Sequence, residues 1–410
     1  MMASVSTAVA GVLCFIASSI SSVGGMGGGG LFIPILSLVL GFELSKATTF
    51  SAFMVAGGSF ANVICYLIAE IGNGGLLINY DLVLISEPCM LLGVSVGVLC
   101  NLSFPQWLIT LLFALFLSYS TWKTCRNGVI LWRQESLRAN RSSSEPAVED
   151  GFHEAATAIA DYKEMEEPLV KETRADIHIE QKRCPWRNFG FIILIWLSFF
   201  CISLLRGNRY GKGIISLEAC GVVYWILFFV QIPLAGFFTA WMLVETRRSE
   251  NQTSNLQDEA EEFSSGRRLN KVAFPFMALL AGILGGMFGI GGGLLISPLL
   301  LQLGILPEVA SATCSFMVFF SSTMSVFQYV MLGIESVDIA ILFAILCFVG
   351  SLIGLQVVRK VIKVYGRASV IVFSVGIVML LSTILMTTFE GIGILRDISS
   401  SHYMGFKSIC

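Results

Sequence analysis

The chain has 410 residues, of which 55% are hydrophobic and 13% are charged, and its formal net charge is −2 at pH 7. A soluble globular domain carries about 25% charged residues, so this composition excludes an ordinary soluble protein. No basic stretch interleaved with aromatic residues occurs, which removes nucleic acid from the expected partners. We expect an integral, multi-pass, all-α membrane protein whose surroundings are the lipid bilayer.

The first element is an apolar run from Val5 to Val23. No basic residues precede it, so we expect a mature membrane helix and not a signal peptide. The run leads into a glycine cluster at residues 24–30, which we call the first glycine cluster. A short apolar segment at 31–40 follows and contains Pro34.

Further apolar runs are long enough to span a bilayer. They lie at about 47–69, 82–101, 105–122, 189–205, 217–244, 310–332, 338–358 and 368–389. A second glycine cluster, residues 285–293, lies between the apolar segments 272–288 and 294–303. The polar stretch 123–188 holds too few apolar residues to form a core and is expected to be largely disordered.

The chain contains an internal repeat. Residues 28–67 align without a gap to residues 291–330, and Tyr66 falls on Tyr329. The predicted organisation is repeat 1 over 1–122, a polar cytoplasmic linker over 123–188, two extra spans over 189–244, a second cytoplasmic linker over 245–271, repeat 2 over 272–389 and a tail over 390–410.

The segment 273–304 would form one helix of ~48 Å, which is too long for one span and too short for two. It is therefore either one broken span or a hairpin with glycines at its tip. The positive-inside rule favours the hairpin, because the basic loop 359–367 then faces the cytosol and its uncharged counterpart 101–105 does not. Each repeat then crosses the membrane an odd number of times, so the repeats are inverted and both termini face away from the cytosol. The charges of the loop after residue 205, including Arg206, oppose this orientation.

Glycine costs about 1 kcal/mol per helical position relative to alanine, so each cluster should end its helix. Irregular backbone persists in a bilayer only where protein covers it or where it lines a cavity. The helix N-termini that follow would present N–H donors and a partial positive charge to an anion. The glycines expected to bind substrate are Gly27, Gly28, Gly29 and Gly30 in the first cluster and Gly289, Gly291, Gly292 and Gly293 in the second.

The alternative role for glycine is close helix packing. We favour it for the scattered glycines at i, i+4 spacing, which are Gly93, Gly97, Gly350 and Gly354. The match to a GxGxxG pattern at 25–30 is a false lead, because it follows a bilayer-length run and not a β-strand.

Three hydroxyl residues, Ser51, Thr313 and Ser315, could contact substrate, or they could bond to backbone carbonyls of neighbouring turns. Glu87 is the best candidate for a buried acid that couples transport to protons, although it could equally lie at the membrane interface. The histidines and cysteines lack metal-ligand spacing, so we expect neither a metal nor another cofactor. No nucleophile, base and orienting group occur together, so no catalytic residues are predicted.

The stretch 24–34 reads GGMGGGGLFIP and the stretch 289–298 reads GIGGGLLISP. Both motifs resemble those of the sulfite exporter TauE/SafE family, and the long linker with two extra central spans resembles its plant branch. The resemblance implies a permease for a small sulfur-containing or organic anion, such as sulfite or an organosulfonate.

The leading functional hypothesis is secondary transport of a small anion by alternating access, with the substrate at the paired glycine clusters. Two alternatives remain: a passive anion channel, and a membrane scaffold or receptor that acts through residues 123–188.

Overall fold

The computed structural model describes residues 2–25, 28–73, 77–142, 185–206, 221–254, 263–303, 305–333 and 336–365, with scattered residues between 372 and 388. Regular structure in these ranges is entirely helical. The helices are α1 (Met2–Ser21), the short 3-10 helix η1 (Ser22–Gly24), α2 (Gly29–Leu40), α3 (Leu44–Asn73), α4 (Tyr80–Ser103), α5 (Gln106–Ser142), α7 (Pro185–Arg206), α8 (Val222–Ser254), α9 (Phe263–Phe288), α10 (Gly293–Gln302), α11 (Pro307–Met331) and α12 (Val337–Tyr365).

Seven of the described helices are long and apolar enough to cross a membrane: α3, α4, α5, α7, α8, α11 and α12. Shorter apolar stretches lie in α1, α2 and α9, at Val5–Ser21, Gly29–Leu40 and Ala273–Phe288. The prediction of an all-α, multi-pass membrane protein is therefore confirmed. The relation between the two repeats, including their inversion, stays a prediction.

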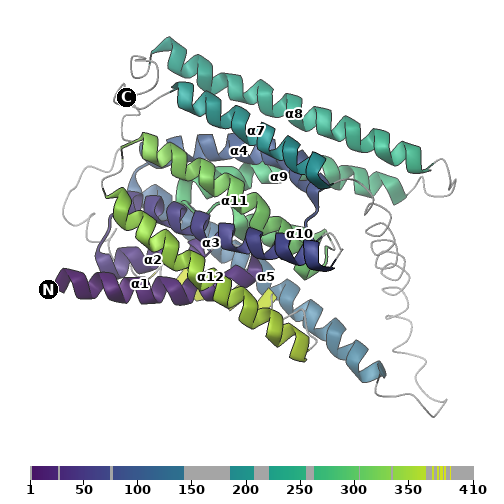
Figure 1. Cartoon of the computed structure of the whole chain (residues 1–410), viewed down its shortest axis with the longest axis horizontal. Helices are drawn as coiled ribbons and strands as arrows, with labels where there is room; N and C mark the ends of the chain where they lie inside the picture. Colours follow the sequence, from purple (N-terminus) through teal and green to yellow (C-terminus); the bar gives the residue numbers. More distant parts are fainter. Residues whose placement is uncertain are drawn as a thin grey trace.

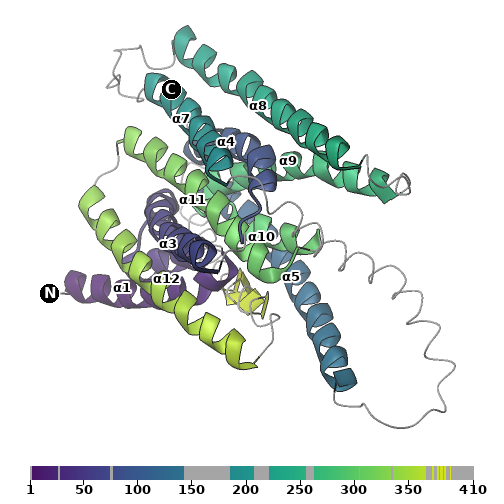
Figure 2. The same cartoon turned by 45° about the vertical axis from the view of Figure 1, so that its right-hand side comes forward.

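The helices differ in how deeply they are buried (Figure 1). In the most apolar 18-residue stretch of each helix, 83% of α4 and 78% of α11 is buried inside the protein, against 22% of α7 and 28% of α8. Helices α7 and α8 run side by side along one flank, and α1 and α12 lie on the opposite flank (Figure 2). The core is therefore built around α3, α4, α9 and α11, with the two extra central helices α7 and α8 added from outside.

Glycines set the closest helix contacts. A Cβ atom at Gly97 of α4 would collide with the carbonyl oxygen of Ile283 in α9, and one at Gly354 of α12 would collide with that of Ser19 in α1. The packing role is confirmed for all four scattered glycines, Gly93, Gly97, Gly350 and Gly354. The fourth long helix of each predicted repeat thus packs on the first helix of the other.

The helix ends differ from the sequence expectation. Helix α5 continues to Ser142, about twenty residues into the segment 123–188 that was expected to be disordered, and α8 continues to Ser254. The reason is that charged residues such as Arg and Glu end the apolar stretch without ending the helix, because both are good helix formers. Residues 143–184 lie outside the described part of the chain, as does most of the expected span 368–389.

We expect Gly97→Ala to lower the free energy of unfolding by about 1–3 kcal/mol, because its methyl group overpacks against the α9 backbone. Gly236→Ala is the matched control, since Gly236 lies in α8 with no atom within 4 Å of the added Cβ. That change should be neutral or stabilising by up to about 1 kcal/mol through helix propensity. Thermal unfolding of both purified variants in detergent is the measurement, and equal effects would contradict the packing role of Gly97.

Candidate functional site at the glycine clusters

The first glycine cluster separates two helices. α1 ends at Ser21, η1 covers the next three residues, and α2 begins at Gly29. Gly28 is the N-cap of α2 and has φ +88°, a left-handed conformation that favours glycine. It carries no side chain that could cap the helix. Gly27, which was expected to bind substrate, lies outside the described residues.

The second cluster has the same local construction. α9 ends at Phe288 and α10 begins at Gly293. The N-cap is Gly292, again left-handed with φ +72° and again without a side-chain cap. Each cluster therefore ends one helix and starts another whose N-terminus has no capping side chain. The two new helices, α2 and α10, pack against α1 and α9 respectively.

The two clusters meet in the structure although more than 250 residues separate them in the chain. A Cβ atom placed on Gly29 would lie only 2.7 Å from the Cα atom of Ile290 in the second cluster. The hydroxyl of Ser297 in α10 also donates a hydrogen bond of 3.1 Å to the carbonyl of Gly24. The fold thus brings the candidate glycines of both halves to one place in the protein interior.

Side chains of surrounding helices donate to several carbonyl oxygens of the second cluster, and to those of Ser22 and Gly24 at the start of the first. The hydrogen bonds run from Ser297 to Gly24, Asn62 to Ser22, Tyr329 to Gly286, Asn101 to Met287, Ser51 to Gly289, Ser321 to Gly291 and Cys314 to Gly293, at 2.7–3.6 Å. Since a buried carbonyl without a partner is costly, these donors stabilise the irregular backbone. They also occupy the acceptors that would repel an anion.

The backbone N–H groups at the helix starts are the hydrogen-bond donors of the clusters. The first N–H groups of any helix have no carbonyl one turn earlier to bond to. In α2 and α10 the N-cap glycines offer no side-chain acceptor either. Each helix N-terminus also carries about half a positive charge. With several cluster carbonyls engaged and a glycine at both N-cap positions, this region can accommodate an anion through backbone N–H groups, without a metal or an arginine.

The structure separates the three candidate hydroxyl residues. Ser51 lies at the second cluster, but its proton is already donated to Gly289. Ser315 accepts a hydrogen bond of 3.4 Å from Asn62, the residue that holds the carbonyl of Ser22. Thr313 instead accepts from the backbone N–H of Asn79 just before α4. Ser51 and Thr313 therefore both join separate segments of the chain, and contact of any of the three residues with substrate stays a prediction.

Glu87 is fully buried in α4, and neither carboxylate oxygen has a hydrogen-bond partner. Met90 follows one helical turn later on the same side of α4. Its methyl group lies 2.8 Å from the position that a Cβ of Gly292 would occupy. Glu87 is thus a buried acid one helical turn of α4 from Met90, whose methyl group contacts the N-terminus of α10. Its part in proton coupling stays a prediction.

Several residues of the site were not among the candidates. Ser297, Ser321 and Asn101 each donate to a cluster carbonyl. Their signal in the sequence was a hydroxyl or amide inside an otherwise apolar run, and Ser297 stands within the repeated glycine motif itself. Such residues are too common in membrane helices for the sequence to show which of them reach the clusters.

Known proteins resemble the chain over nearly its whole length. The family model described as sulfite exporter TauE/SafE matches residues 9–160 and 189–386. Sulfite exporter TauE/SafE family protein 2 of Arabidopsis thaliana is 53% identical over 412 residues, covering 99% of this chain and 88% of the relative. Protein 1 of the same family and organism is 52% identical, covering 99% and 89%. No solved structure gives a significant match.

We expect Asn101→Leu to lower the free energy of unfolding by about 1–3 kcal/mol, because it leaves the carbonyl of Met287 buried without a donor. Ser198→Ala is the control, since that hydroxyl bonds within α7 at the exposed surface, and it should change stability by less than about 0.5 kcal/mol. Chemical or thermal unfolding in detergent measures both. An Asn101→Leu protein as stable as the wild type would show that the cluster carbonyls do not need these donors.

Proposed function

This chain belongs to the sulfite exporter TauE/SafE family, and we propose that it is a secondary transporter of a small sulfur-containing or organic anion, such as sulfite or an organosulfonate. Family membership and seven membrane-length helices make it an integral, multi-pass membrane transporter and not an enzyme. The proposal concerns the substrate, its place of binding and the mechanism.

The observation that carries the proposal is the meeting of the two glycine clusters, with the carbonyl of Gly24 and several carbonyls of the second cluster already hydrogen-bonded. In our proposal the substrate anion binds the N–H groups at the starts of α2 and α10, around Gly28, Gly29, Gly292 and Gly293. This arrangement favours anions because it offers donors and two partial positive charges. It holds no fixed arginine or lysine, so release does not require breaking a full ion pair.

The close approach of Gly29 and Ile290 bears on the mechanism. A gap narrower than a methyl group separates the clusters at this point, so an anion enters only after they move apart. In the proposed cycle, the pair α1–α2 and the pair α9–α10 separate toward one side of the membrane and then the other. Such a cycle is possible because the two helix starts come from different halves of the chain. The halves can move against each other around an anion bound between them.

Glu87 is the residue proposed to couple this cycle to protons. A carboxylate charge buried without a partner is costly, so its protonation and its access to water change together. Because Met90 lies between Glu87 and Gly292, movement of the α10 N-terminus would change the surroundings of Glu87. Transport of an anion together with a proton follows from this linkage.

The proposed function is tested by uptake of radiolabelled sulfite, sulfate and a small organosulfonate into proteoliposomes, with and without a pH gradient. We expect saturable uptake of at least one sulfur-containing anion. Flux that rises linearly with concentration would favour a passive channel. No flux of any of the three from correctly inserted protein would contradict the proposed substrate class and favour the scaffold alternative.

Gly29→Ala tests the binding site, because it adds a single methyl group between the clusters where the backbone φ of residue 29 tolerates alanine. We expect normal insertion and uptake slower by at least about tenfold, because displacing the N–H donors by a fraction of an ångström weakens their contact with the anion. Gly72→Ala is the control, since no atom lies within 4 Å of its added Cβ. Because the alanine methyl lies 2.7 Å from the Ile290 Cα atom, thermal unfolding of Gly29→Ala is measured beside uptake to show that the variant folds. Leucine at Gly29 or Gly292 would collide with backbone more severely and would test folding instead. Unchanged uptake by Gly29→Ala would show that the substrate does not bind between the glycine clusters.

Glu87→Gln tests the coupling. The amide keeps the shape of the side chain but cannot exchange a proton, so we expect uptake that no longer responds to a pH gradient. Glu308→Gln is the control, because Glu308 is an exposed acid in the first turn of α11. Uptake by both variants is compared at equal and unequal pH across the vesicle membrane. A wild-type response in Glu87→Gln would assign coupling to another group.

A further inference from the structure

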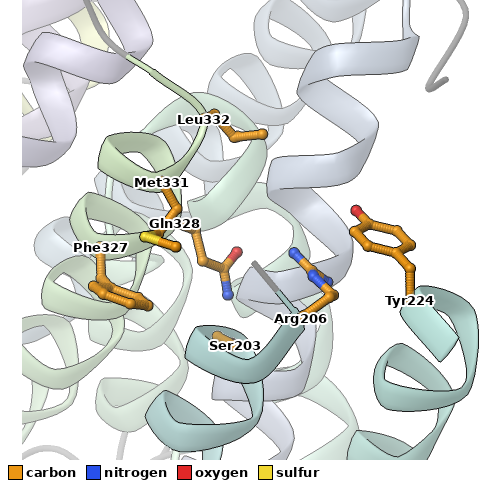
Figure 3. A pocket seen from close by; sticks show the side chains of 7 residues that line it. All are labelled: Ser203, Arg206, Tyr224, Phe327, Gln328, Met331 and Leu332. Carbon is orange, nitrogen blue, oxygen red and sulfur yellow. The ribbon is translucent and has the colours of Figure 1, made fainter. Parts of the chain in front are cut away.

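A buried, unpaired arginine lies outside the glycine clusters. Arg206 is the last residue of α7, and only 7% of its surface is exposed. Among the residues that the structure describes, its Nε and Nη1 atoms have no hydrogen-bond partner. Figure 3 shows the guanidinium group between Tyr224 of α8 and Gln328 of α11. The sequence had placed this charge in an exposed loop.

The arginine lines a small cavity between α7, α8 and α11. Ser203, Phe327 and Gln328 line it as well, and it has room for about one water molecule. The Ser203 hydroxyl and the Gln328 Oε1 atom are buried and also lack partners. Three polar groups from two helices therefore converge on one space without satisfying one another.

Aromatic rings hold the guanidinium but do not balance its charge. The Cζ atom of Arg206 lies 5.1 Å from the ring centre of Tyr224 and 5.6 Å from that of Phe228. Such cation–π contacts are weaker than the cost of an isolated buried charge. Charged groups in protein interiors are consequently paired with an opposite charge. A single water in the cavity could bond to Arg206 but would leave the positive charge uncompensated.

Gln328 can serve as a further donor. Its Nε2 atom is 2.8 Å from the hydroxyl of Ser95 in α4. Amide oxygen and nitrogen are assigned from the bonding pattern, and the reversed amide would accept from Ser95 and turn its NH₂ group to the cavity. Arg206, Ser203 and Gln328 would then all donate toward the same space, which is the arrangement that an anion requires.

We propose that Arg206, Ser203 and Gln328 form a second anion-binding site, which takes chloride. The cavity size favours an anion little larger than water, and one negative charge matches the single guanidinium. The site belongs to the added helices α7 and α8 where they meet α11. It is separate in space from the proposed substrate site at the glycine clusters.

The site is linked to the second cluster through α11. Gln328 bonds to Ser95, and the next residue, Tyr329, donates to the carbonyl of Gly286 at 2.8 Å. An anion that fixes Gln328 therefore also fixes the turn of α11 that supports the cluster. Occupancy of the Arg206 site should stabilise the folded protein and change the transport rate.

The experiment measures thermal unfolding of the purified protein in detergent, in a buffer whose only other anion is bulky gluconate. We expect chloride to raise the unfolding temperature saturably. Arg206→Met should remove this response, because methionine fills the space between the rings without a charge. Arg187→Gln, an exposed arginine near the start of the same helix, should respond like the wild type.

Two further variants keep the outcome clear. Ser203→Leu fills the cavity and retains Arg206, so it should weaken the response even if Arg206→Met fails to fold. Gly29→Ala alters the glycine clusters and should leave the response unchanged, which separates this site from the proposed transport site. An unresponsive wild type, or an equal response in the wild type, Arg206→Met and Ser203→Leu, would overturn the proposal.

Discussion

Inside a bilayer a backbone polar group has no water to bond to, and this constraint governs the centre of the protein. Regular helices satisfy it within themselves, but the two glycine clusters do not. They persist because side chains from α3, α4, α10 and α11 donate to their carbonyls. Each of these donors ties a cluster to a different helix. The irregular backbone is therefore also the point at which most of the central helices are joined.

The same constraint has a chemical consequence at the glycine clusters. Hydroxyl and amide side chains donate hydrogen bonds to several backbone carbonyls there, and the N-cap residues of the following helices offer no side-chain acceptor to the N–H groups. Glycine at both N-cap positions is essential to this asymmetry. Serine or aspartate there would cap its own helix and would place an acceptor where the anion is proposed to bind.

The sequence predicted the apolar spans well because hydropathy directly measures what a bilayer requires. It predicted the helix ends poorly, as α5 shows, because charges mark where the bilayer stops and not where the hydrogen-bonded helix stops. The duplication indicated that the glycine clusters are related. Their contact through Gly29 and Ile290 depends on helix packing across the two halves, which no local pattern contains.

The misplacement of Arg206 has a similar cause. Counting charges near the end of an apolar run assigns an arginine to the loop, because an exposed arginine is the usual case. Its burial depends on Tyr224 and Phe228, which lie about twenty residues later and reach it only because α7 and α8 pack together.

Charge balance connects the proposed substrate with the proposed proton. Two helix N-termini contribute about half a positive charge each, so together they balance one negative charge. A monovalent anion between α2 and α10 leaves the interior nearly neutral, whereas a divalent anion leaves an excess negative charge in a medium of low polarity. The buried Glu87 carboxyl would add to that excess unless it were protonated. In the proposed mechanism a proton on Glu87 therefore accompanies the anion, and the closer the substrate comes to two negative charges, the more strongly its binding requires that proton.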